Sequence, residues 1–164
     1  MFEIIQNKII PSTAALLHQV ALWNFFSKKI VFTNGCFDIL HLGHIDYLCK
    51  AADLGDVLIV GLNSQNSVSR IKGPNRPIND ERQRSIVVAS LHFVDNVILF
   101  DEDTPYELIK LVQPDVLVKG ADYKPEDIVG GDIVRSKGGK ILTLDYLPGY
   151  STTLIEQKIR NFEK

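Results

Sequence analysis

The sequence predicts an α/β fold: a doubly wound, five-stranded parallel sheet with helices on both faces. Five short apolar runs recur along the 164 residues, and segments with helical spacing of apolar residues lie between them. The runs are apolar throughout rather than alternating, which is typical of strands covered on both faces. The succession of strand and helix favours parallel pairing through crossover helices.

The five predicted strands share a short length and a high content of Val, Ile and Leu. They span residues 29–33, 57–62, 96–100, 116–119 and 140–144. The first run ends at Asn34-Gly35 and the second follows Leu54-Gly55-Asp56, which are typical turn sequences. These turns delimit the first two strands.

Helices are expected between and after the strands, over residues 44–53, 81–91, 104–112, 127–136 and 151–162. Asp80 suits the N-cap of the second helix, and Pro105 suits the first turn of the third. Gly130-Gly131 interrupts the fourth, since glycine lowers helix propensity.

Two segments fall outside this alternation. Residues 1–28 form an N-terminal extension, in which an amphipathic stretch over residues 13–26 predicts one packing helix. Residues 70–78 hold two prolines, one glycine and three basic residues, which is typical of a mobile loop.

The composition excludes several functional classes. Lys and Arg total 18 and Asp and Glu total 20, for a net charge of −2, whereas nucleic-acid-binding proteins usually carry a basic surplus. No apolar run approaches the ~18 residues of a membrane-spanning helix. Residues 1–11 lack the features of a signal peptide, and two cysteines are too few for a disulfide framework. We therefore expect a cytoplasmic protein that binds neither membranes nor nucleic acids.

The loop after the first predicted strand carries the strongest chemical signal. It reads Thr33-Asn-Gly-Cys-Phe-Asp-Ile-Leu-His-Leu-Gly-His44, without a GxGxxG pattern, and the chain contains no GxxxxGK[ST]. His41 and His44 fall at a helix start, where free backbone N–H groups and the helix dipole attract anions. Gly43 lets a phosphate approach the backbone closely. A structural zinc site is disfavoured, because it needs further ligands.

A second anion site is predicted where the last strand meets the last helix. Residues 149–153 read Gly-Tyr-Ser-Thr-Thr. A hydroxyl residue at a helix start is often only a cap. Here, however, three hydroxyls in a row accompany the free N–H groups. We interpret the two loops as two helix N-termini that hold one triphosphate.

These two loops resemble those of the HxGH nucleotidylyltransferase superfamily. The segment Leu117-Val-Lys-Gly-Ala-Asp-Tyr-Lys124 is similar to its D-glycero-β-D-manno-heptose 1-phosphate adenylyltransferase branch. The resemblance covers residues 28–161 and implies a Rossmann-like nucleotidyltransferase domain over residues 29–164. Further matching pieces are Asn63-Ser64, Lys72-Gly73, Arg76-Pro77-Ile78, Arg84, Val94-Asp95, Asp101-Glu-Asp-Thr-Pro105 and Pro114-Asp115.

The resemblance implies transfer of AMP from ATP to a sugar 1-phosphate, giving ADP-heptose and pyrophosphate for a bacterial lipopolysaccharide core or a similar glycan. Cytidylyltransferases for glycerol 3-phosphate typically read Arg-Thr-Glu-Gly-Ile where this chain reads Tyr146-Leu-Pro-Gly-Tyr150, which favours ATP over CTP. Gln65 and Ala121 depart from the heptose pattern, which has Asp and Gly there. A cytidylyltransferase and a non-catalytic nucleotide-binding module are the alternatives.

The resemblance assigns catalytic roles to three residues. His44 is expected at the α-phosphate and at the bridge to the departing pyrophosphate, and His41 at the neighbouring phosphate oxygens. Lys72, on the predicted mobile loop, is expected to close over the triphosphate. The β- and γ-phosphates are expected at the hydroxyl residues of the second anion site.

Nucleotide binding is assigned to residues around the same loops. Gly35 and Phe37 are expected to offer backbone N–H groups and room, and Asp38 to orient a histidine or a substrate hydroxyl. Arg84 either reaches the phosphates or pairs with an acid on its helix. Lys119 ends the fourth strand, where the family places adenosine. The full set is Thr33, Asn34, Gly35, Phe37, Asp38, Gly43, Arg84, Lys119, Gly120, Asp122, Ser151, Thr152 and Thr153.

The resemblance also implies Mg²⁺ as the cation of ATP, held mainly by phosphate oxygens and water. The partners implied are small molecules, namely ATP and the sugar 1-phosphate. Relatives are commonly oligomeric, so a homo-oligomer such as a dimer is expected.

Overall fold

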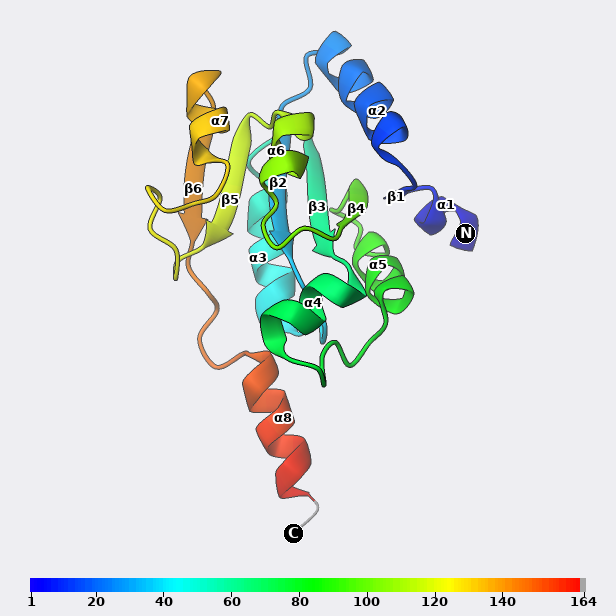
Figure 1. Cartoon of the computed structure of the whole chain (residues 1–164), viewed down its shortest axis with the longest axis vertical. Helices are drawn as coiled ribbons and strands as arrows, with labels where there is room; N and C mark the ends of the chain where they lie inside the picture. Colours follow the sequence, from blue (N-terminus) through cyan, green and yellow to red (C-terminus); the bar gives the residue numbers. More distant parts are fainter. Residues whose placement is uncertain (163–164) are drawn as a thin grey trace.

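Six strands form one parallel sheet in the computed structural model, which describes residues 1–162 (Figure 1). The order across the sheet is β1-β4-β3-β2-β5-β6, and every neighbouring pair is parallel. The strands are β1 (Ile9–Ile10), β2 (Ile30–Gly35), β3 (Val57–Asn63), β4 (Asn96–Phe100), β5 (Val116–Gly120) and β6 (Lys140–Leu144). The predicted fold class is confirmed, with six strands in place of the expected five.

Helices connect and flank these strands. They are α1 (Phe2–Gln6), α2 (Thr13–Phe25), α3 (Leu42–Ala52), α4 (Gln65–Lys72), α5 (Glu81–Ala89), α6 (Tyr106–Val112), α7 (Gly131–Ser136) and α8 (Thr152–Asn161). Helices α2, α6 and α7 pack on one face of the sheet, while α3 and α5 pack on the other. Within residues 1–162, no helix combines the length and the apolar character needed to cross a membrane.

The core follows from the alternation of side chains along the central strands. On β2, Ile30 and Phe32 join the cluster that α2 and α6 cover, while Val31 joins the cluster that α3 covers. All three side chains are fully buried, and β3 is buried over its whole length. Burial on both faces explains why these strands are continuously apolar in the sequence.

The N-terminal extension contains more secondary structure than the single helix expected from the sequence. Besides α2, it contains α1 and the short strand β1. Ile9 and Ile10 of β1 pair with Val97 and Ile98 of β4 and so extend the edge of the sheet. A strand of two residues leaves no periodic signal in a sequence, so this pairing was not foreseen. The division of the chain at residue 28 stays a prediction.

Two connections also differ from expectation. Residues 65–72 form α4, which takes up the start of the predicted mobile loop. Ser64 caps this helix by accepting the backbone N–H of Ser67 at 3.0 Å. Helix α7 begins only at Gly131, because Gly130 adopts a left-handed φ of 80° that no helix continues through.

Two aspartates fix where the central strands begin. Asp95 precedes β4, and its carboxylate accepts the backbone N–H of Leu58 in β3 at 2.7 Å. Asp115 precedes β5 and accepts the backbone N–H of Ile30 in β2 at 2.8 Å. Each carboxylate therefore binds the start of a neighbouring strand and holds the register of the two strands.

Replacement of Asp115 by alanine should lower the free energy of unfolding by about 1–3 kcal/mol, because the buried N–H of Ile30 loses its acceptor. Urea denaturation measures this change. Asp127→Ala, at an exposed position, is the matched control and should change stability by less than about 0.5 kcal/mol. Equal stability of the two variants would contradict the role given to Asp115.

Candidate functional site

A cavity of about 890 Å³ opens at the carboxyl end of the sheet. It lies beside the ends of β2, β3 and β5, where the crossover into β3 runs over one face and the crossover into β5 over the other. Ligands of open α/β sheets bind at such a switch point. The predicted site residues that line the cavity are Asn34, Gly35, Phe37, His41, Gly43, His44, Lys72, Lys119, Gly120, Asp122, Ser151 and Thr152.

Two histidine rings stack at the N-terminus of α3. The ring centroids of His41 and His44 are 3.9 Å apart and the ring planes are 24° apart. Phe37 meets the His44 ring edge-on, with the centroids 5.3 Å apart. The Nδ1 atoms of both histidines are buried and have no hydrogen-bond partner within residues 1–162. Both rings therefore line the cavity, while their Nδ1 atoms are shielded from solvent.

Gly43 allows this arrangement. A Cβ atom at this position would lie 3.1 Å from the His41 ring and 3.3 Å from the Cβ of Tyr150. A side chain would therefore crowd both the histidine and the connection that leads to α8. The absence of a Cβ lets these two parts of the site approach each other.

Both histidines are neutral near pH 7. Burial lowers the pKa of His44 to about 4, and His41 and Lys72 act in the same direction. Burial also lowers the pKa of His41. Each neutral ring carries one N–H donor and one acceptor nitrogen. An anion bound beside the rings favours their protonated form, so anion binding and protonation reinforce each other here.

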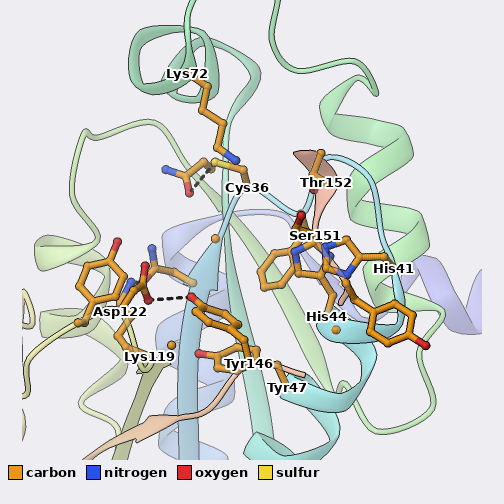
Figure 2. A pocket seen from close by; sticks show the side chains of 18 of the residues that line it. Cys36, His41, His44, Tyr47, Lys72, Lys119, Asp122, Tyr146, Ser151 and Thr152 are labelled. Carbon is orange, nitrogen blue, oxygen red and sulfur yellow. Dashed lines mark hydrogen bonds between the residues drawn. The ribbon is translucent and has the colours of Figure 1, made fainter. Parts of the chain in front are cut away.

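The N-terminus of α8 faces the same cavity. Ser151 is its N-cap and accepts the backbone N–H of Leu154 at 3.1 Å. Ser151 and Thr152 line the cavity, and Figure 2 shows them on the side of the two histidine rings. The first turn of a helix presents unpaired N–H groups and the positive end of its dipole. Two helix N-termini, those of α3 and α8, therefore meet at the same cavity.

Lys119 and Asp122 form the other end of the cavity (Figure 2). The Lys119 Nζ donates to Oδ1 of Asn34 and lies 5.2 Å from the centre of the Tyr123 ring. Burial lowers the pKa of Lys119 to about 8, although Asp122 acts to raise it. The Tyr146 hydroxyl donates to Oδ1 of Asp122 at 2.8 Å. A cation, a carboxylate and aromatic rings thus surround this end.

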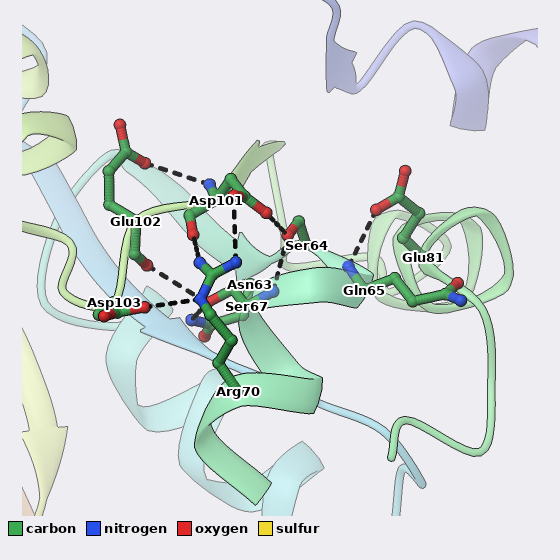
Figure 3. A network of polar contacts seen from close by, with 9 residues as sticks. All are labelled: Asn63, Ser64, Gln65, Ser67, Arg70, Glu81, Asp101, Glu102 and Asp103. Carbon is green, nitrogen blue, oxygen red and sulfur yellow. Dashed lines mark hydrogen bonds and ion pairs between the residues drawn. The ribbon is translucent and has the colours of Figure 1, made fainter. Parts of the chain in front are cut away.

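Lys72 reaches the cavity from the last turn of α4, and a polar network anchors that helix (Figure 3). Arg70 pairs with Asp101 and Asp103 in the loop after β4, at 3.3 and 2.9 Å. The Ser64 hydroxyl, at the start of α4, also donates to Asp101. Because both ends of α4 are tied to this loop, a helix rather than a mobile loop carries Lys72.

A family model described as cytidylyltransferase-like matches residues 32–158. The chain belongs to this cytidylyltransferase-like family. The matched range contains both anion sites and the whole cavity wall between them. The resemblance to HxGH nucleotidylyltransferases is thereby confirmed.

Curated relatives in this family share high identity. Bifunctional protein HldE from Nitratiruptor sp. is 58% identical over 134 residues, which are 82% of this chain and 28% of that protein. Bifunctional protein HldE from Magnetococcus marinus is 49% identical over 154 residues, 94% of this chain and 32% of that protein. The chain thus spans less than a third of the length of these relatives.

Two solved structures share the architecture. The lipopolysaccharide core biosynthesis protein from Thermoplasma volcanium is 30% identical, with a TM-score of 0.57 over 73% of this chain and 97% of that one. Pantoate-beta-alanine ligase from Francisella tularensis, complexed with beta-gamma ATP and beta-alanine, has a TM-score of 0.59 over 95% of this chain and 78% of that one. At 18% identity, the second shows the fold alone.

Thr33 and Arg84, both expected to bind nucleotide, lie outside the cavity of this family member. Thr33 is buried, and its hydroxyl is 2.7 Å from that of Tyr47. Arg84 is 1% exposed and donates to the backbone carbonyl oxygens of Cys36 and Asn63, each at 2.8 Å. Arg84 therefore ties together the ends of β2 and β3 and meets neither the cavity nor an acid on its own helix.

Asp38 and Thr153 also differ from expectation. Thr153 is exposed on α8, outside the cavity. Asp38 accepts the backbone N–H groups of Ile78 and Asn79 at 2.9 Å and the Arg76 guanidinium at 2.7 Å. Burial acts to raise the pKa of Asp38, but these donors together lower it. Asp38 thus anchors the loop before α5, and it makes no hydrogen bond to a histidine within residues 1–162.

An aromatic wall was not foreseen from the sequence. Tyr47, Tyr146 and Tyr150 line the cavity, and the rings of Tyr47 and Tyr146 are 6.4 Å apart. A Cβ atom at Gly120 would overlap the Tyr146 hydroxyl, so this tyrosine needs the glycine beneath it. The sequence spacing could have indicated Tyr47 as part of this wall, because Tyr47 follows His44 by three residues and so lies on the same face of the helix.

The His44 imidazole should titrate near pH 4, because burial disfavours its charged form. An NMR pH titration of the folded protein, with the ring signals assigned through a His44→Gln variant, measures this pKa. The unfolded chain in urea is the reference and should titrate near the ordinary value of about 6.5. A folded-state midpoint near 6.5 would contradict the partly buried, neutral histidine pair.

Proposed function

We propose that this chain transfers AMP from ATP to D-glycero-β-D-manno-heptose 1-phosphate, giving ADP-heptose and pyrophosphate. The observation that supports the proposal most is the pair of helix N-termini, of α3 and α8, that face one cavity beside two neutral histidines. The membership in the cytidylyltransferase-like family and the identity to the HldE proteins support nucleotidyl transfer as the reaction class. The proposal places this reaction in the cytoplasm.

The chemistry needs positioning rather than a strong base. A phosphate oxygen of the sugar 1-phosphate attacks the α-phosphorus of ATP, and the new P–O bond forms as the bond to the β-phosphate oxygen breaks. The electron pair leaves with pyrophosphate. The attacking oxygen is already an anion, so no proton has to be removed. Catalysis consists of aligning two anions and stabilising the charge on the transferring group.

Each end of the cavity has a distinct role in this proposal. His44 donates its N–H to the α-phosphate and the bridging oxygen, and His41 binds the neighbouring oxygens. Lys72 supplies positive charge from α4. Ser151 and Thr152 bind the β- and γ-phosphates through hydroxyl and N–H groups. Thr153, whose side chain is exposed, contributes only its backbone N–H.

The nucleoside is assigned to the opposite end. Lys119 and Asp122 hydrogen-bond the ribose and the base, and the Gly120 backbone lies beneath them. Tyr146 occupies the position at which glycerol 3-phosphate cytidylyltransferases typically carry arginine. Its hydroxyl is engaged with Asp122, so it presents an aromatic ring rather than a cation. This feature favours the larger purine base of ATP.

Mg²⁺ enters this scheme as part of the MgATP substrate. Within residues 1–162, no group of three His, Cys, Asp or Glu side chains gathers as a metal cage. Mg²⁺ in triphosphate sites keeps several waters and binds phosphate oxygens. The cation neutralises the triphosphate, while the residues of the chain hold its oxygens in place.

The family description favours one second candidate, a cytidylyltransferase. Glycerol 3-phosphate or a similar phosphate ester is the acceptor that the sequence resemblance suggests for it. Pyrophosphate release with Mg²⁺ separates the two when ATP and CTP are each combined with heptose 1-phosphate and glycerol 3-phosphate. The proposal expects turnover only with ATP and heptose 1-phosphate. Turnover with CTP and glycerol 3-phosphate would support the second candidate. No turnover in any combination would contradict both.

His44→Ala should lower kcat by about 10²–10³-fold, because one preorganised donor to the transferring phosphate is lost. The rate of pyrophosphate release measures this effect, and circular dichroism checks that the variant is folded. His18→Ala, on the exposed side of α2, is the matched control and should keep the wild-type rate. A near-normal rate for the His44 variant would overturn the mechanism.

The rate should also depend on the charge of Lys119. Because its pKa is about 8, the ammonium form is lost as the pH rises through this value, and kcat/KM for ATP should fall above it. Lys119→Arg keeps its charge to about pH 12, so the fall should disappear up to about pH 10. A pH–rate profile of both proteins tests this. Superimposable profiles would exclude Lys119 as the titrating group.

A further inference from the structure

Helix α8 carries one of the two anion sites, yet it is loosely attached. It follows a connection without regular structure after β6 and projects beyond the end of the sheet (Figure 1). None of its residues is fully buried. Within residues 1–162, its one ion pair with the rest of the chain joins Glu156 to Arg76. Among the described residues, this contact is therefore the ionic link between α8 and the rest of the chain.

Arg76 sits between two carboxylates. Its Nη1 donates to Oδ2 of Asp38 at 2.7 Å, while its Nη2 pairs with Oε1 of Glu156. The Arg76 side chain is 18% exposed, the Asp38 side chain 1% and the Glu156 side chain 25%. The planar guanidinium is suited to binding two carboxylates at once in fixed geometry. Asp38 is itself held by backbone N–H groups, so the inner end of this chain of contacts is rigid.

The two ends of this chain of contacts belong to the two anion sites. Asp38 lies three residues before His41 in the loop that leads into α3. Glu156 lies about one helical turn beyond Thr152, on the helix whose start lines the cavity. A guanidinium thus connects the histidine loop to the helix that carries the hydroxyl residues. Arg76 itself lies outside the cavity.

We infer that Arg76 and Glu156 are positioning residues that hold the N-terminus of α8 at the separation from His41 and His44 that a triphosphate spans. This inference rests on the proposed function. Without the ion pair, α8 occupies the binding position for only part of the time, and the apparent affinity for ATP falls by that fraction. Glu156→Gln keeps the Arg76–Asp38 contact intact, so its effect should appear in binding more than in folding.

Calorimetric titration of the full chain with MgATP, without an acceptor sugar, tests the inference. Glu156→Gln keeps the size of the side chain and removes its charge. We expect the Kd for ATP to rise about five- to tenfold, in proportion to the lost occupancy of the bound position. Lys158→Gln, an exposed change on the same helix, is the matched control and should bind as the wild type does.

The double variant Arg76→Gln/Glu156→Gln distinguishes the loss of one shared contact from two independent effects of the substitutions. Two residues that act through one contact should not add, so the double variant should bind ATP no more weakly than Arg76→Gln alone. In turnover, Glu156→Gln should raise KM for ATP more than it lowers kcat, since binding common to ground and transition states is lost. Backbone hydrogen exchange should be faster in α8 and unchanged in β2.

The outcomes distinguish this inference from the proposed function. If the wild type binds ATP and Glu156→Gln binds it equally well, the positioning role is wrong while the proposed function stands. If the wild type does not bind ATP, the proposed function fails and the inference fails with it. An additive loss in the double variant would show that the two residues act separately, which also contradicts the inference.

Discussion

The parallel pairing of β2 with β3 on one side and β5 on the other is the constraint on which the site depends. It brings the carboxyl ends of three strands to one edge, and the crossovers on opposite faces leave a cavity between them. The histidine loop follows β2, Lys119 lies one residue before the end of β5, and β3 leads directly into α4. The pairing of these strands therefore brings residues that lie far apart in the sequence together at one cavity, although no single sequence motif contains them all.

Burial gives this edge its chemical character. Lys119 is buried and the two histidine rings are partly buried, which lowers their pKa values and keeps the imidazoles neutral near pH 7. Charges interact more strongly in such a place than in water. Groups already fixed by the fold would also need little reorganisation in the proposed phosphoryl transfer. Arg84 and Asp38, both buried, keep the loops around the cavity in position.

The sequence was most informative about features that depend on residues close together in the chain, namely strands and helix starts. Continuous apolar runs predicted five strands, because burial on both faces leaves that pattern. The two histidines and the Ser-Thr-Thr segment were predicted because helix starts present free N–H groups. The sequence was less informative about contacts between residues that lie far apart in the chain. A buried arginine and a phosphate-binding arginine look alike in sequence, so the contacts of Arg84 with the carbonyl oxygens of Cys36 and Asn63 were not foreseen. The loop contacts of Asp38 span about forty residues and leave no periodic signal.

A crystal structure of the chain with Mg²⁺ and a non-hydrolysable ATP analogue is the most direct measurement of the central idea, that two helix N-termini hold one triphosphate. The α-phosphate should lie against the rings of His41 and His44, the γ-phosphate at Ser151 and Thr152, and the base at Lys119. A triphosphate bound away from the start of α8, or a base stacked on the histidines, would contradict this arrangement.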